Sequence, residues 1–246
     1  MRILFALLRL VFGIAIITAI VAQLAASTQF WTSIGIANLS GVYTNFFSFF
    51  TIDSNVLAAV VLLIGAGILA VKKGADPSWF NVLRACAVTY MVVTGIVYNL
   101  LLRGLPLPQG VTVEWSNEVL HAIGPAYLLI DWLFAPGRQA LPMRRIWAVL
   151  AFPIVWVVYT MVRGPLADDA VQKRSYWYPY PFLNPHNSNE GYATVAFYIV
   201  LIAAVIGLVA AGVIWISRHW YPWYPVAAAV NSAAADQPSS VSAARR

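Results

Sequence analysis

Polar side chains that could take part in catalysis stand near the start of an apolar segment beginning at residue 47. Ser48, Thr51 and Asn55 are spaced to share one stripe of a helix, and Ser54 lies beside them. One interpretation is an ordinary helix start, in which Ser48 or Thr51 caps the first turn and Asp53 favours the positive end of the helix dipole. That interpretation leaves Asn55, which lies deeper, in need of a hydrogen-bond partner. A hydroxyl in this setting is also a possible nucleophile, provided that a neighbouring base takes its proton.

His121 is the only histidine placed within an apolar segment. Asn117 and Glu118 precede it by about one helical turn, where either could fix the tautomer of the imidazole. Histidine is a favoured general base because its pKa lies near neutrality. A buried structural histidine, bonded to a neighbouring helix, is the simpler alternative. The sequence leaves both open.

Further polar residues gather at the ends of other apolar segments. They are Tyr98 and Asn99 in the third segment and Tyr159 and Arg163 in the fifth. An aromatic stretch with several prolines follows over 176–186 and contains Tyr178 and Tyr180. Such a stretch is typical of an aromatic belt at the membrane interface. Alternatively, it forms a lid over the outer mouth of the protein, as long loops ordered by prolines often do.

The segments that must position these groups are apolar and long. Of 246 residues, 61% are hydrophobic and 10% are charged, whereas soluble domains have about 25% charged residues. A membrane-spanning helix needs about 20 mostly apolar residues. Six stretches meet this standard, at about 4–26, 47–71, 83–103, 116–135, 146–163 and 193–216. We therefore predict an all-α transmembrane bundle of six helices over residues 1–220, followed by a disordered cytoplasmic tail over 221–246.

The distribution of lysine and arginine predicts that both termini are cytoplasmic. Positive residues concentrate at the N-terminus, around the second loop, in the fourth loop and after the last span, whereas the first loop over 27–46 has no charged residue. The first span could instead be a cleaved signal peptide, although its length and small-residue spacing favour a retained anchor. The inner halves of the spans look almost wholly apolar, which predicts plain packing there. That pattern argues against a transport path through the midplane.

Several classes of site have no counterpart in the sequence. It contains no G-x-S-x-G elbow, no H-E-x-x-H helix, no Walker A motif and no G-x-G-x-x-G loop. Cys86 is the only cysteine, which excludes a disulfide within the chain and a cysteine-based metal cage. The net charge is +6, but the positive residues are scattered singly and in pairs, which predicts a topology signal rather than a nucleic-acid surface. We expect no metal, no cofactor and no nucleic-acid partner.

Two short motifs resemble a known group of membrane proteins. The stretches Phe50-Thr51-Ile52-Asp53-Ser54-Asn55 and His121-Ala122-Ile123-Gly124-Pro125, with Asp131-Trp132 following, resemble the androgen-induced-gene family of six-pass proteins and particularly its bacterial relatives. The Tyr-Pro-Tyr-Pro-Phe run at 178–182 also looks like those relatives. The likeness covers about residues 5–217 in span order and spacing. It implies a multi-pass protein of a bacterial plasma membrane.

The resemblance also implies a chemistry. Animal members of this family are intramembrane threonine hydrolases that cleave fatty-acid esters of hydroxy fatty acids. Their threonine and histidine correspond here to Thr51 and His121. After the threonine this chain is more polar than the animal proteins, which brings Ser54 and Asn55 into contention for further roles and leaves the substrate open. Membrane lipids are then both the solvent and the expected substrate.

The mechanistic hypothesis from the sequence is an acyl transfer. His121 takes the proton of Thr51, which attacks the ester carbonyl, and water then hydrolyses the acyl-threonine. Asn117 or Glu118 would orient the imidazole, and Asn55 or a backbone N–H would stabilise the oxyanion. The main alternative is a non-catalytic lipid-binding or scaffold protein that uses the same polar cavity. A small transporter and an intramembrane protease are further alternatives, and the protease lacks a recognisable Ser or Asp motif.

Overall fold

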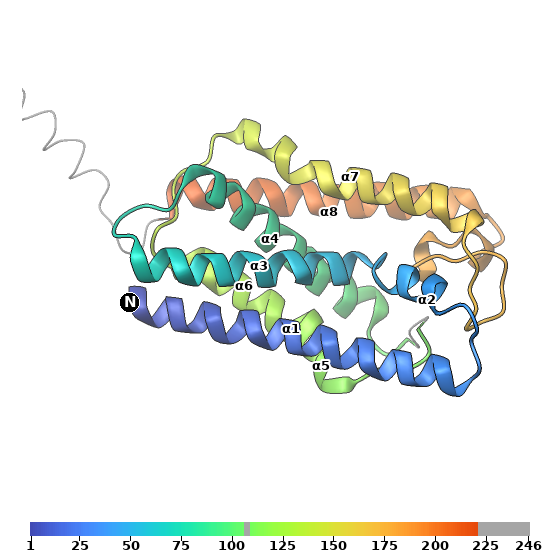
Figure 1. Cartoon of the computed structure of the whole chain (residues 1–246). Helices are drawn as coiled ribbons and strands as arrows, with labels where there is room; N and C mark the ends of the chain where they lie inside the picture. Colours follow the sequence, from blue (N-terminus) through green and yellow to red (C-terminus); the bar gives the residue numbers. More distant parts are fainter. Residues whose placement is uncertain (106–108, 221–246) are drawn as a thin grey trace, which may run out of the picture.

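A computed structural model describes residues 1–105 and 109–220 as an elongated bundle of helices, with no strand in these two ranges (Figure 1). The helices are α1 (Arg2–Ser33), α2 (Leu39–Phe46), α3 (Phe50–Val71), α4 (Ser78–Val97), α5 (Glu114–Glu118), α6 (Gly124–Phe134), α7 (Ile146–Arg163) and α8 (Tyr192–His219). Two π-helical turns, Tyr98–Leu102 and Val119–Ile123, extend α4 and join α5 to α6. Short 3₁₀ turns are Met143–Arg145, Gly164–Leu166, Pro181–Leu183 and Pro185–Asn187. The tail predicted over 221–246 lies outside the described residues.

Five helices within the described ranges are long and apolar enough to cross a membrane. They are Arg2–Ser33, Phe50–Val71, Ser78–Leu102, Met143–Leu166 and Tyr192–His219. Each overlaps one of the predicted spans over nearly its whole length, and this set is compatible with a multi-pass membrane protein. The fourth predicted span, over 116–135, is also helical without a break, from Glu114 to Phe134. It does not count among the five, and it contains Glu114, Glu118 and Asp131.

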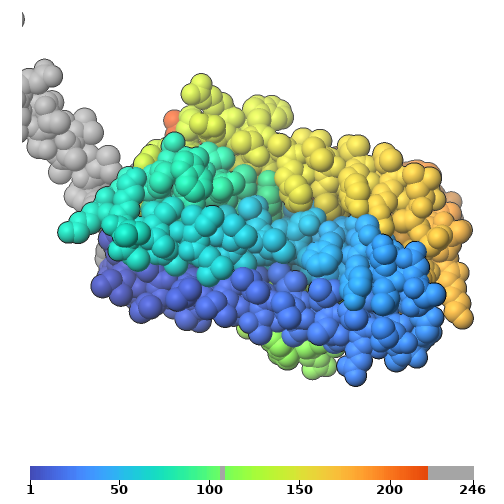
Figure 2. Space-filling view, viewed as in Figure 1, coloured from blue at the N-terminus to red at the C-terminus, as the bar shows by residue number. Residues whose placement is uncertain are grey.

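The helices pack around α4. This helix contacts α3, α6, α7 and α8, while α1 packs along α3 and also touches α5 and α6. In Figure 1, α4 runs between α3 and the α7–α8 pair, and α6 lies behind α1 and α3. The space-filling view shows α1 and α3 alongside each other for most of the length of the body (Figure 2). The buried apolar core follows this arrangement, with most of the α4 side chains inside it.

The structure corrects several predicted boundaries. The loop expected over 27–46 contains the end of α1 and the whole of α2, whose first turn is capped by the Asn38 side chain accepting a hydrogen bond from Gly41 N–H at 3.1 Å. Helix α3 is preceded by Phe49 without a side-chain cap, so neither Ser48 nor Thr51 caps it. Instead the Ser48 hydroxyl donates back to the Thr44 carbonyl at 2.6 Å.

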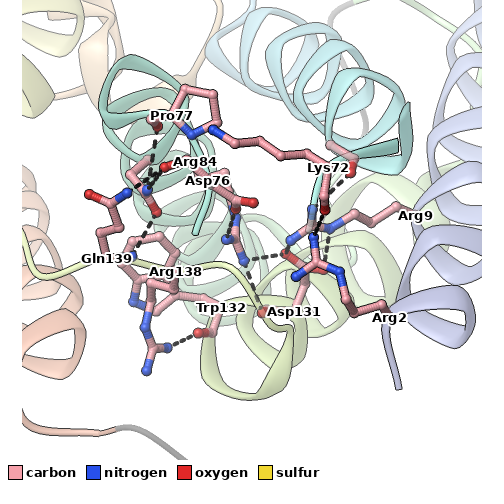
Figure 3. A network of polar contacts seen from close by, with 12 residues as sticks. Arg2, Arg9, Lys72, Asp76, Pro77, Arg84, Asp131, Trp132, Arg138 and Gln139 are labelled. Atoms are coloured by element: carbon pink, nitrogen blue, oxygen red, sulfur yellow. Dashed lines mark hydrogen bonds and ion pairs between the residues drawn. The ribbon is translucent and has the colours of Figure 1, made fainter. Parts of the chain in front are cut away.

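A cluster of four buried charges overturns the prediction that the inner halves of the spans are plain packing surface. Arg9 on α1 pairs with Asp131 on α6 through two contacts of 2.7 and 3.1 Å. Arg84 on α4 contacts Asp131 at 3.0 Å and Asp76, in the loop before α4, at 2.8 Å. Figure 3 shows these side chains converging from three helices and the loop (Figure 3). We name Arg9, Asp76, Arg84 and Asp131 the charged cluster.

The charged cluster lies within about two turns of the helix ends at the end of the bundle where the chain begins. The topology prediction counts Arg9 and Arg84 among the positive residues next to cytoplasmic loops. Their side chains are instead buried in the bundle. Two positive and two negative side chains face one another, so the cluster carries no formal net charge. Every one of these side chains is almost fully buried. Opposite charges that satisfy one another in this way can remain inside an apolar bundle.

Candidate functional site

Thr51 lies in the first turn of α3 and is bonded to the aromatic stretch that follows α7. Its backbone N–H donates to the Tyr180 hydroxyl at 3.1 Å, and its own hydroxyl is 3.1 Å from the same oxygen. The Phe49 ring packs edge-on against Tyr180 and Trp177, with centroids 5.8 and 5.4 Å apart. The aromatic stretch thus reaches into the bundle at Thr51.

The Tyr180 hydroxyl can orient the Thr51 hydroxyl. Because its oxygen accepts the Thr51 N–H, the phenol proton is left to donate to the Thr51 oxygen. Removal from solvent raises the pKa of Tyr180 to about 12, so the phenol keeps its proton at neutral pH. With this bond in place, the proton on the Thr51 hydroxyl is free to point elsewhere in the site.

His121 lies in the π-helical turn between α5 and α6 and is buried. Its Nδ1 is 2.9 Å from the backbone carbonyl of Asn117, which can only accept a hydrogen bond. This contact puts the proton on Nδ1 and leaves Nε2 as the acceptor. The ring stacks on Tyr98 with centroids 4.0 Å apart. The imidazole is therefore held in the tautomer that a general base requires.

Thr51 and His121 line the same small cavity. It has a volume of about 40 Å³, and its polar lining consists of Gln23, Thr51, Tyr98, Gln109, Asn117, His121 and Tyr180. No hydrogen bond joins Thr51 to His121 among the described residues. A cavity of this size has room for a water molecule, since one needs about 10–15 Å³. The shared cavity therefore has space for a water between Thr51 and His121, and a general base can act through such a water.

The predicted supporting residues around His121 have distinct positions. Asn117 orients the imidazole through its backbone carbonyl, while its side-chain amide donates to the Tyr98 hydroxyl. Glu118 does not bond to His121. It forms an exposed, two-pronged ion pair with Arg103 at 2.8 and 3.0 Å. Asn99 accepts from Arg103 and donates to the His121 carbonyl at 3.3 Å, which ties the end of the third span to the fourth.

Asn55 connects two helices instead of facing the cavity. Its amide group donates to the carbonyl of Thr51 at 2.9 Å and to that of Leu120 at 3.2 Å. These two hydrogen bonds connect α3 to the turn that contains His121, and they fix the position of Thr51 relative to that turn. Both amide protons are thereby occupied, which removes them as donors to an oxyanion. Ser54 is fully buried beside it and does not line the cavity.

Arg163 and Tyr178 hold the aromatic stretch in place through contacts outside the cavity. Arg163 donates to the Asn45 side chain at 2.5 Å, and its guanidinium lies 5.2 Å from the centroid of the Trp177 ring. Tyr178 is buried directly against Gly164, where a β-carbon would come within 2.1 Å of the tyrosine ring. These residues therefore fix the path of the chain that carries Tyr180, and they do not line the cavity.

Two cavity-lining glutamines were missed in the sequence. Gln23 is buried in α1, where its amide bonds to Ser27 and to the Val111 carbonyl, and its oxygen accepts Val113 N–H at 2.9 Å. The available signal was a polar side chain inside an apolar span, which is costly without partners. Gln109 follows the third span and gave no such signal. In the described part of the chain, no group of three metal-binding side chains comes together.

Comparisons with models of protein families, with curated proteins and with solved structures found no match for this chain.

Proposed function

We propose that this protein is an intramembrane hydrolase of fatty-acyl esters in which Thr51 is the nucleophile and His121 the general base. The observation that carries the proposal is the shared cavity, which is lined both by Thr51, whose hydroxyl contacts Tyr180, and by His121, whose Nδ1 is already bonded. The likeness of the Thr51 and His121 motifs to those of the androgen-induced-gene family supports the same pair. Membrane lipids would then supply the substrate.

The proposed reaction has two steps. His121 Nε2 takes the Thr51 proton while Thr51 Oγ1 attacks the carbonyl carbon, and the tetrahedral intermediate then expels the alcohol, which leaves with the proton from the imidazolium. Water, deprotonated by His121, attacks the acyl-threonine, releases the fatty acid and restores the hydroxyl. The Tyr98 hydroxyl suits the oxyanion better than Asn55, because it accepts from Asn117 and keeps its own proton to donate into the cavity.

The proposal includes a topology of six spans with both termini in the cytoplasm of a bacterium. The continuous helix Glu114–Phe134 is the additional span, and it lies inside the bundle against α1 and α4. Its charges have partners, because Asp131 belongs to the charged cluster and Glu118 pairs with Arg103. Thr51 and His121 then lie toward the outer face, where water can reach an ester whose acyl chain stays in an apolar environment.

A covalent-labelling experiment tests the nucleophile. We expect a fluorophosphonate to react with the purified, detergent-solubilised protein and to leave its phosphonyl group on Thr51, with loss of fluoride. Mass spectrometry would locate the adduct, and Thr51→Ala would abolish it. Thr89→Ala is the matched control, because Thr89 is buried on α4 and does not line the cavity that Thr51 and His121 share. Equal labelling of wild type and Thr51→Ala, or lipid binding without any ester turnover, would favour the scaffold alternative.

Tyr180→Phe should slow turnover without preventing folding. The substitution removes one hydroxyl that contacts Thr51 twice and leaves the packed ring in place. We expect kcat for a lipid ester to fall about tenfold, the equivalent of one well-placed hydrogen bond, with little change in KM. Tyr176→Phe is the control, since Tyr176 stacks on His186 and does not contact Thr51. An unchanged kcat in Tyr180→Phe would show that the phenol does not position the nucleophile.

A further inference from the structure

A second cavity meets the first at Thr51. It has a volume of about 190 Å³ and lies between α4, α7, α8 and the chain segment around Tyr180. Thr51, Tyr98, Leu102 and Tyr180 line both cavities. Away from these shared residues the lining is almost entirely hydrophobic, and it includes Val93, Val97, Leu150, Val157, Ile199 and Ile206. Two cavities therefore adjoin Thr51, and the smaller one has the larger share of polar side chains in its lining.

The larger cavity runs parallel to the helices from the level of Thr51 toward the middle of the bundle. Its lining on α8 extends from Ile199 to Ile206, and on α7 from Val157 to Leu150. Seven residues of helix advance about 10 Å. An extended chain advances about 1.2 Å per bond, so this length matches about eight bonds. The volume of about 190 Å³ is sufficient for a chain of that order, since one water-sized group needs about 10–15 Å³ by the measure used for the small cavity.

The wall of the larger cavity reaches the outer surface of the bundle. Ile154 on α7 lines it and is 52% exposed, and Ala203 on α8 lines it and is also exposed. Both side chains lie in the middle part of long apolar helices. A hydrocarbon chain could therefore pass from the lipid into the cavity between α7 and α8 without crossing water.

We infer that the larger cavity is the acyl subsite and that it selects a medium-length fatty-acyl group of about eight carbons. The inference rests on the proposed function, because the ester carbonyl must lie at Thr51. The acyl chain then occupies the larger cavity, and the alcohol part lies in the smaller one, on the side of His121. The cavity length sets the preferred chain, because methylenes beyond its inner end at Leu150 and Ile206 find no apolar space inside the protein.

Neighbouring alanines on α8 provide a matched test. Ala203→Phe places a ring at the cavity wall, whereas Ala204→Phe places the same ring on an exposed position that does not line the cavity. Purified protein in detergent would be assayed with nitrophenyl acetate, butyrate, octanoate, decanoate and palmitate. We expect wild type and Ala204→Phe to prefer octanoate. In Ala203→Phe, kcat/KM for octanoate relative to acetate should fall at least about tenfold, because each buried methylene contributes about fourfold.

The converse substitution lengthens the cavity. Leu150→Ala opens its inner end and should move the preference toward decanoate, while Val155→Ala, on the exposed face of α7, should not. Identical chain-length profiles in Ala203→Phe and Ala204→Phe, together with hydrolysis that depends on Thr51, would overturn the acyl subsite and leave the proposed function standing.

Photolabelling separates failure of the subsite from failure of the enzyme. Octanoic acid with a terminal diazirine should label peptides of α7 and α8 in wild type and Ala204→Phe, and much less in Ala203→Phe. Absence of any ester turnover would contradict the proposed function. In that case equal labelling of all three proteins would also overturn the subsite, whereas selective loss in Ala203→Phe would support acyl binding by this cavity.

Discussion

Alanine at Thr51, at His121 or at both is expected to lower kcat for a fatty-acyl ester about 10³- to 10⁶-fold, with the double variant no slower than the slower single variant. Loss of the hydroxyl removes the atom that forms the acyl intermediate. Loss of the imidazole leaves a neutral hydroxyl, which is a weak nucleophile at neutral pH. The two side chains line one cavity and, in the proposed mechanism, act on the same proton, so removing the second should not lower kcat further. Steady-state kinetics on the purified proteins would measure kcat for wild type, the two single variants and the double variant.

Two further variants serve as controls for the effect of the alanine substitutions on kcat. Thr51→Ser retains a hydroxyl at the same place and should retain measurable turnover, whereas Thr89→Ala should match wild type, because Thr89 lines neither cavity. Losses that multiply in the double variant would mean that Thr51 and His121 act in separate steps. Wild-type rates in either single variant would rule out the proposed pair.

Asp131→Ala is expected to destabilise the protein by about 3–5 kcal/mol, the usual cost of removing one partner from a buried ion pair. Asp131 accepts from both Arg9 and Arg84, so its loss leaves two guanidinium groups without their shared carboxylate inside the bundle. For a chain of this size the midpoint of thermal unfolding should fall by about 6–20 °C. Thermal unfolding in detergent, followed by circular dichroism, measures the shift.

Glu118→Ala is the matched comparison for Asp131→Ala. It also breaks an ion pair with arginine, but Glu118 and Arg103 have side chains that are 42% and 45% exposed. Water and salt can replace such a contact, so the midpoint should move several-fold less than in Asp131→Ala. Equal shifts in the two variants would show that the charged cluster contributes no more to stability than a surface pair does.

The two ends of the bundle differ in what they contain: a buried charged cluster at one end and the two cavities at the other. At the end where the chain begins, the charged cluster joins α1, α4, α6 and the loop before α4. At the other end, Tyr180 and Asn55 fix Thr51 relative to the turn that contains His121. A rigid attachment at one end holds the helices whose opposite ends form the cavities. The proposed catalytic groups would require such support, because small displacements lower the rate by large factors.

The amino-acid sequence by itself determined the helical class and the position of the long apolar helices. Hydropathy over about 20 residues is a local property, so five predicted spans coincide with membrane-length helices and the fourth with an unbroken helix. Residue type and spacing also identified Thr51, His121 and the aromatic stretch as candidates. The short helix α2 was missed, because a capped segment of eight residues inside a loop has no long-range pattern.

Only the tertiary structure decided which of these groups meet. Thr51 and Tyr180 are separated by 129 positions and Arg9 and Asp131 by 122, and no periodicity within one helix relates them. Arginine and aspartate in water-facing loops and in a buried cluster look alike in the sequence, since burial depends on which helix faces pack together. The same packing joins two helices through the Asn55 amide, and it places Thr51 where two cavities meet.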